Sequence, residues 1–222
     1  MTTIDFIQEF EPFGKWSQGL GLGIESEQIQ RAAKAQIMNY LPEITEQLQT
    51  VWEHRDKEYI EKIGGSYKRL VIPSVEKKHF FTGTKHISVL KADLDLWPFV
   101  ITYASDAKPY AIQEDQFDTY SVPLCVEIFC CNGPIENETE LHTERGWEIE
   151  QELDSMLQRL SDAVLMCIRK DPSLGGVVGQ IEKPNNATTS LPWSRKEAGT
   201  ETGNYYIFQG KQFDFTVQKM TY

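Results

Sequence analysis

The long amphipathic segment between Glu144 and Arg169 constrains the fold more than any other feature of this chain. Its apolar residues recur every three or four positions, which is the period of an α-helix with one apolar face. Acidic residues crowd its first turns and Arg169 and Lys170 close it, as the helix dipole favours. A helix of this length spans roughly 35 Å, so we predict that it crosses one face of a β-sheet. The apolar stripe consists of Trp147, Ile149, Leu153, Met156, Leu157, Leu160, Ala163, Val164, Cys167 and Ile168.

Strands are predicted on both sides of this helix, where apolar residues alternate or run continuously. Tyr120–Cys131 is the most apolar candidate and is rich in β-branched residues, so we expect it at the centre of the sheet. Asn132–Pro134 should end this strand, and Ser105–Asp118 should be a loop. A final hairpin or strand pair is expected around Gly210. Shorter strands are predicted at Tyr67–Val75, at His79–Leu90 with a turn at Gly83, in Asp95–Tyr103 after Pro98, and at Val177–Glu182.

The first third of the chain carries a helical pattern. Ser26 is a candidate N-cap for a helix over Glu27–Tyr40, and Pro42 can open a second helix that Gly64–Gly65 should stop. This pattern fits a helical hairpin or one kinked helix. Together the elements predict an α+β fold, in which a mixed, mainly antiparallel sheet packs against the long amphipathic helix and an N-terminal helical hairpin.

We divide the chain into an N-terminal arm, residues 1–25, and one α/β domain, residues 26–222, with an extended loop at 183–203. The arm combines aromatic residues with the glycine-rich run Gly19–Gly23, which suits a segment that lies along a surface. The loop is long and polar, whereas most connections are near five residues, so we expect either disorder or ordering by a neighbouring molecule. Exposed aromatic residues and these irregular segments supply the candidate interface residues: Phe10, Phe13, Trp16, Trp193, Arg195, Tyr205 and Tyr222.

The sequence carries no pattern typical of an enzyme, a cofactor site or a metal site. It has no Gly-x-Ser-x-Gly, no Walker loop and no His-Glu-x-x-His. Its glycine-rich run lacks the spacing of a dinucleotide fingerprint. The four cysteines form no Cys-x-x-Cys pair and share no ligand spacing with the four histidines, so buried thiols are expected. We therefore predict a protein that is not an enzyme, with no catalytic, cofactor-binding or metal-ligating residues.

Charge and hydropathy restrict the partners. The net charge of −11, from 33 acidic and 22 basic residues, argues against a surface that grips nucleic acid through its phosphates. No window approaches the ~20 apolar residues of a membrane span. The sequence Met-Thr-Thr-Ile-Asp-Phe lacks the basic and apolar regions of a secretory signal, so we expect a protein of the cytosol in which it is made.

The order of the later elements has a known counterpart. One strand opens with Trp97-Pro98-Phe99-Val100, and a second covers Val122–Phe129. The long helix ends in Asp171–Val178, which reads Asp-Pro-Ser-Leu-Gly-Gly-Val-Val, and the chain finishes in Phe213–Tyr222. With the helical start at Leu41-Pro42-Glu43, this order resembles the tail-terminator (tail-completion) proteins of tailed bacteriophages and related head-to-tail joining proteins.

This resemblance covers roughly residues 26–222 and implies a homo-oligomer, a hexameric ring of α/β subunits. Such a ring caps the tail tube, ends its polymerisation and meets the head-tail connector, and in contractile tails it also meets the sheath. DNA would pass through the lumen without specific binding, and no membrane would be involved. The protein would belong to the tail or neck of the virion, assembled in the host cytoplasm.

Alternatives stay open because the first 25 residues and the segment 183–203 make this chain longer than many members of that family. A neck or adaptor protein, which completes the head, is one alternative. The cap of a phage-derived contractile injection system is another. A small cytosolic enzyme or binding domain is the alternative from a different class.

Overall fold

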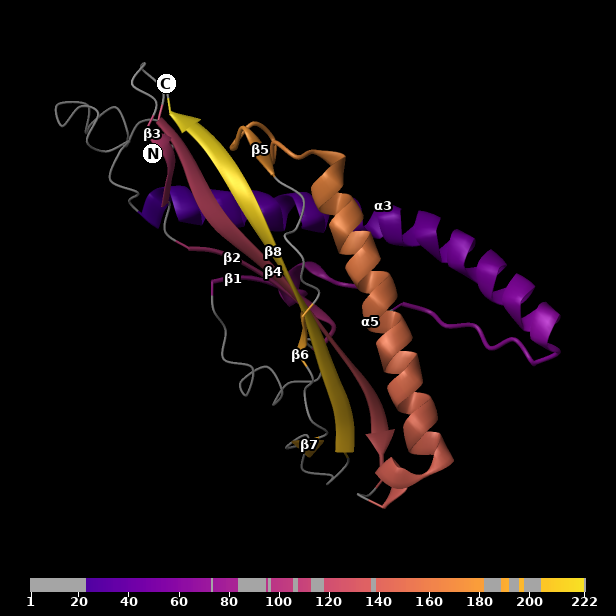
Figure 1. The fold of residues 1–222 in the computed structure, drawn as a ribbon. Helices are drawn as coiled ribbons and strands as arrows, with labels where there is room; N and C mark the ends of the chain where they lie inside the picture. The colour runs from indigo at the N-terminus through magenta and orange to yellow at the C-terminus, as the bar shows by residue number, and fades with distance from the viewer. Residues whose placement is uncertain are drawn as a thin grey trace.

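The computed structural model describes residues 23–72, 74–83, 95, 97–105, 108–112, 118–136, 139–181, 189–191, 196–197 and 205–221. Within these residues two long α-helices, α3 (Gly23–Ile63) and α5 (Glu144–Lys170), pack against a curled, mostly antiparallel sheet (Figure 1). Short 3-10 turns lie at Lys77–His79 (η2) and Glu140–His142 (η4). The chain therefore has the predicted α+β fold.

Two long antiparallel strands, β4 (Asp118–Ile135) and β8 (Tyr205–Thr221), form the middle of the sheet. The path through the sheet runs β1-β2-β4-β8-β5, and the β1–β2 pair is parallel while the other described pairs are antiparallel. A further strand, β3, pairs with β4, whereas β6 and β7 pair with β8. The shorter strands are β1 (Phe80–Thr82), β2 (Phe99–Ala104), β3 (Lys108–Ile112), β5 (Gln180–Ile181), β6 (Thr189–Leu191) and β7 (Lys196–Glu197).

Strand β4 takes the central place that its apolar sequence predicts. Because side chains alternate across a strand, Val122, Leu124, Val126, Ile128 and Cys130 join the core formed with both helices. The strand does not end at Asn132–Pro134 as expected. Instead a break in its register between Asn132 and Ile135 absorbs the proline, and Ile135 pairs with Tyr205.

Strand β8 is one continuous strand, so the expected hairpin around Gly210 is wrong. Gly210 pairs with Phe129 of β4, and a Cβ atom added at Gly210 would meet the Phe129 ring at 2.4 Å. The glycine therefore makes room for an aromatic ring that lies over the strand, and it does not form a turn.

Of the two alternatives predicted for the N-terminal helical pattern, the helical hairpin is wrong and the single kinked helix is confirmed, because Pro42 lies inside α3. Leu41 and Ile44, on either side of it, are both buried in the same core, so the two halves continue along one apolar face. A proline costs a helix the hydrogen bond to the fourth residue before it and bends it, and Figure 1 shows the halves pointing in different directions. Ser26 is not an N-cap but lies within the helix, where its hydroxyl donates to the Ser105 carbonyl (2.7 Å).

Both helices end where the sequence indicates. Gly64 has a positive φ of 74° after α3, and the Gly65 amide donates to the Ile60 carbonyl (3.2 Å). After α5, the Asp171 carboxylate accepts from the amides of Ser173 (2.9 Å) and Gly175 (2.8 Å). The hydrogen bond that the Ser173 hydroxyl donates to this carboxylate, followed by those from the two amides, holds the pKa of Asp171 below its usual value. The Asp-Pro-Ser-Leu-Gly-Gly segment is thus a helix stop with a local structural cause.

The short strands were predicted less well. In Tyr67–Val75 the described residues form no strand, because the segment runs back along α3 and the Leu70 carbonyl accepts from Gln49 (3.0 Å). Strand β1 covers only the start of His79–Leu90, and residues 84–94 lie outside the described part of the chain. Strand β3 lies in the expected loop Ser105–Asp118, where Pro109 and the polar residues that flank the strand favour a loop. The predicted strand at Val177–Glu182 shortens to β5, and the segment 183–203 contains β6 and β7.

Candidate docking surface

The second half of α3, which we call the projecting half-helix, extends past the sheet (Figure 1). Contacts with α5 fix its direction: Arg159 forms an ion pair with Asp56 (2.5 Å) and lies 5.5 Å from the centre of the Trp52 ring. The segment that follows α3 contacts the projecting half-helix from another side. Arg69 pairs with Glu53 (2.7 Å), and Lys68 pairs with Glu152 of α5. The projecting half-helix is therefore a fixed part of the fold.

Apolar side chains are exposed along the projecting half-helix. Val51, Tyr59 and Ile63 are 46%, 63% and 58% exposed. With Arg55, which is also exposed, they are spaced by four residues and form one ridge on the helix surface. We call Val51, Arg55, Tyr59 and Ile63 the distal ridge. Large exposed apolar side chains gathered on one element are typical of a docking surface.

The distal ridge continues the apolar stripe that α3 buries in its first half. Ile37, Leu41 and Ile44 are almost fully buried against the sheet and α5, and Leu48 and Trp52 are partly buried. Figure 1 shows α3 and α5 diverging toward the C-terminal end of α3, so the stripe extends past the surface that could cover it. The apolar pattern of the sequence does extend to Tyr59, but it does not reveal where the covering sheet ends.

Helix α5 exposes two further large apolar side chains. Trp147 in its first turn is 55% exposed and Met166 is 43% exposed. Trp147 was expected in the buried stripe, and this expectation is wrong because Trp147 lies six residues before Leu153, which places it about 120° around the helix from the stripe at 3.6 residues per turn. The other predicted members of the stripe are buried, apart from the partly buried Ile149.

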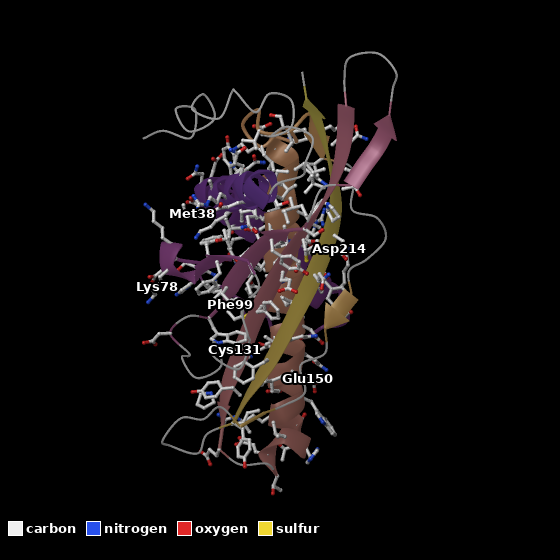
Figure 2. The ribbon with its side chains drawn as sticks, turned by 90° about the vertical axis from the view of Figure 1, so that its left-hand side faces the viewer. Met38, Lys78, Phe99, Cys131, Glu150 and Asp214 are labelled. Carbon is white, nitrogen blue, oxygen red and sulfur yellow. The ribbon has the colours of Figure 1, made fainter. Side chains whose placement is uncertain are left out.

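The sheet face opposite the helices carries an aromatic cluster. Trp97, Phe99, Ile101, Phe129 and Phe208 are buried there (Phe99 is labelled in Figure 2). The Phe99 and Phe129 rings stack with centroids 4.8 Å apart, and Trp97 meets Phe99 edge-on at 4.5 Å. This packing explains why the Trp-Pro-Phe segment precedes β2. It gives that face of the sheet an apolar half beside a polar one.

The polar half of this face contains Tyr103, Cys125, Glu127 and Asp214 (Asp214 is labelled in Figure 2). Cys125 and Asp214 are opposite each other in the β4–β8 register, and Tyr103 is opposite Cys125 in the β2–β4 register. Desolvation, with repulsion from Asp214, raises the pKa of Glu127. Burial also raises the pKa values of the Cys125 thiol and the Tyr103 hydroxyl. Tyr103 and Cys125 therefore stay protonated at neutral pH, and the Cys125 thiol is a poor nucleophile.

All four cysteines are free thiols, as their apolar surroundings predict. Cys125, Cys130 and Cys167 are buried, and Cys131 is partly buried. Burial raises the pKa of Cys131 to about 12 and that of Cys167 to about 12. Within the described residues, no group of three or more histidine, cysteine or acidic side chains is arranged to hold a metal ion.

The structure describes one of the seven candidate interface residues. Tyr205 opens β8, pairs with Ile135, and packs its partly buried ring against the main core. It belongs to the fold of its own chain, and only part of its ring reaches the surface. The other six, Phe10, Phe13, Trp16, Trp193, Arg195 and Tyr222, lie outside the described residues.

The chain matches no model of a known protein family, and no curated protein matches it. Among the described helices, none combines the length and the hydropathy needed to cross a bilayer.

Proposed function

We propose that this chain is a structural subunit that docks to copies of itself and caps a bacteriophage tail tube as a ring. The observation that carries the proposal is the distal ridge on a braced, projecting helix. An exposed ridge of this kind is costly in a free subunit unless a partner covers it, because apolar surface gains free energy when it leaves water.

The fold agrees in character with the family that the sequence resembles. A long amphipathic helix, α5, lies on an antiparallel sheet, and the last strand, β8, closes that sheet beside β4. The Asp171–Gly176 turn that carries the resemblance ends α5 through its own hydrogen bonds. These features support the proposal through the fold alone, since a shared fold does not establish a shared function.

A ring requires a heterologous interface, in which two different patches of each subunit meet. The projecting half-helix supplies one of these patches. It lies away from the sheet, so a neighbouring subunit can bind it in a head-to-tail arrangement. The net charge of −11 suits a lumen through which DNA passes without sticking. The same charge balance disfavours a role in gripping nucleic acid.

Negative-stain electron microscopy of the purified chain, alone and with tail tubes of the phage that encodes it, tests this function. We expect six-fold rings, free or at one end of each tube. Rings of twelve-fold symmetry would favour an adaptor of the neck. A monomer that neither self-associates nor decorates tubes would contradict the proposal.

A small enzyme or binding domain is the second candidate, and the Tyr103–Cys125–Glu127–Asp214 cluster favours it. Half-buried ionisable groups with shifted pKa values are more frequent at functional sites than elsewhere. A small-molecule screen by thermal shift tests this candidate with the Glu127→Gln variant as its control. A compound that stabilises the native chain and leaves Glu127→Gln unaffected would support it, and a screen without such a compound would count against it.

A further inference from the structure

We infer that the distal ridge of one subunit binds the aromatic N-terminal arm of a neighbouring copy of this chain. The inference rests on the proposed function, because it names the partner that covers the exposed ridge during assembly. Three observations carry it: the position of the ridge, the length of chain that precedes α3, and the charges on the two segments.

The ridge and the arm lie at opposite ends of the same helix. The first 22 residues end at Gly23, where α3 begins, whereas Tyr59 and Ile63 lie in its last turns. Gly23 and Tyr59 are separated by 36 residues of helix, or about 54 Å at the usual rise per residue.

This distance separates Phe13 and Trp16 from Tyr59 at the far end of the ridge within one chain. An extended chain spans at most about 3.6 Å per residue, so Phe13 lies within about 36 Å of Gly23 and Trp16 within about 25 Å. Neither residue can reach Tyr59 of its own subunit, even when the arm is fully extended. A Phe13 or Trp16 ring that covers Tyr59 therefore comes from another copy.

The chemistry of the two segments is complementary. The arm carries Phe10, Phe13 and Trp16 together with the acids Asp5, Glu9 and Glu11 and one base, Lys15. The ridge presents Tyr59 and Ile63 beside the exposed guanidinium of Arg55. Aromatic anchors buried against an apolar ridge provide most of the affinity in such contacts, while exposed charge pairs fix orientation and register.

The contact has a direction, which suits a ring. The front end of α3 in one subunit engages the far end of α3 in the next, so the same contact repeats around the assembly. Head-to-tail contacts of this kind close into rings when the rotation between subunits permits, and otherwise form open filaments.

Photo-cross-linking of the full chain tests the inference directly. Benzoylphenylalanine replaces Tyr59, and chains labelled with ¹⁴N and ¹⁵N are mixed, assembled and irradiated. We expect mass spectrometry to find cross-links between position 59 of one isotope and residues 1–22 of the other. The same group placed at Met166, which is also exposed and apolar, should form no cross-link to residues 1–22 of the other isotope.

A charge exchange provides the second arm of the test. Arg55→Glu should weaken self-association at least threefold, as should Glu9→Lys combined with Glu11→Lys. Combining all three substitutions should restore association toward the native value. A merely structural role of Arg55 would not give this restoration.

The outcomes separate the inference from the proposed function. If the chain self-associates but position 59 cross-links elsewhere, or only within one isotope, the inference is overturned and the ring proposal stands. If sedimentation finds only monomers of the native chain at every concentration and in the presence of tail tubes, the proposed function fails.

Discussion

At the scale of single residues, Gln36 shows how a polar side chain can occupy an apolar stripe. It lies among Ile29, Ala33 and Ile37 on α3 and is itself buried. Its amide nitrogen donates to the carbonyls of Cys167 (2.8 Å) and Asp171 (2.8 Å), with a longer contact to Ile168 (3.2 Å). Gln36 therefore satisfies carbonyls at the end of α5 that the helix itself leaves without partners.

Replacing Gln36 by alanine should destabilise the fold by about 2 kcal/mol, because buried carbonyls would lose their donor. Urea unfolding measures this loss. Gln47→Ala is the matched control, since Gln47 is exposed and bonds only to Glu43 within the same helix. Because alanine favours a helix at least as much as glutamine does, a loss of the same size in both variants would show that the contact between the helices does not account for the effect.

The pH dependence of stability should carry a contribution from Glu127. The folded state raises the pKa of this carboxyl above its usual value of 4.5, so folding favours the protonated form. Stability is therefore lost as the pH rises from the unfolded pKa through the raised folded pKa. Glu127→Gln should be more stable than the native chain at pH 7, and the difference should shrink at pH 4. An equal difference at both pH values, measured by urea unfolding, would contradict this assignment.

At the scale of elements, two positions decide how long a helix and a strand run. Pro42 would be expected to separate two helices, yet the buried residues on both sides of it keep α3 continuous. Gly210 would be expected to form a turn, yet its pairing with Phe129 keeps β8 extended. In both cases tertiary packing overrides the local preference of one residue.

The close approach at Gly210 gives a testable consequence. Gly210→Ala should destabilise the fold by about 1–3 kcal/mol, the usual range for overpacking a core, because the added methyl would enter the Phe129 ring. Gly65→Ala is the control, since its Cβ would meet Ile60 at an ordinary 3.6 Å. Chemical denaturation compares the two. A stable Gly210→Ala variant would show that the ring can move aside.

The sequence predicts elements with strong periodicity and misses those whose form depends on neighbours. Helix α5 and strand β4 are evident from their apolar residues, because one face of each is buried along nearly its whole length. Strand β3 is short and contains Pro109, and it forms because β4 offers it an edge. In the segment after α3, the Leu70 carbonyl accepts a hydrogen bond from the Gln49 side chain of the helix. No local sequence pattern reveals this contact.

The candidate site was predicted only in outline. The distal ridge is not evident from the sequence, because its apolar residues continue the stripe of the first half of α3 without a break. The difference lies in how far the sheet and α5 extend beneath α3. This is a property of the assembled fold and is absent from the periodicity of the helix itself.

At the scale of the whole molecule, the chain combines a well-packed body with one projecting element. The body buries the stripe of α5 and the first half of α3. The projecting element is held by the Arg159–Asp56 ion pair and by the segment after α3. A subunit built in this way is suited to contacts with copies of itself, and its function depends on whether those contacts form.

Sedimentation velocity of the native chain and the Tyr59→Glu/Ile63→Glu variant, over a range of concentrations, tests that central claim most directly. Both positions are exposed, so the unfolding temperature of the variant should lie within about 2 °C of that of the native chain, as expected for surface substitutions. Met166→Glu, the control, should associate like the native chain. The account predicts that the ridge variant requires at least a tenfold higher concentration to associate. Equal association of the native chain and the ridge variant would contradict it.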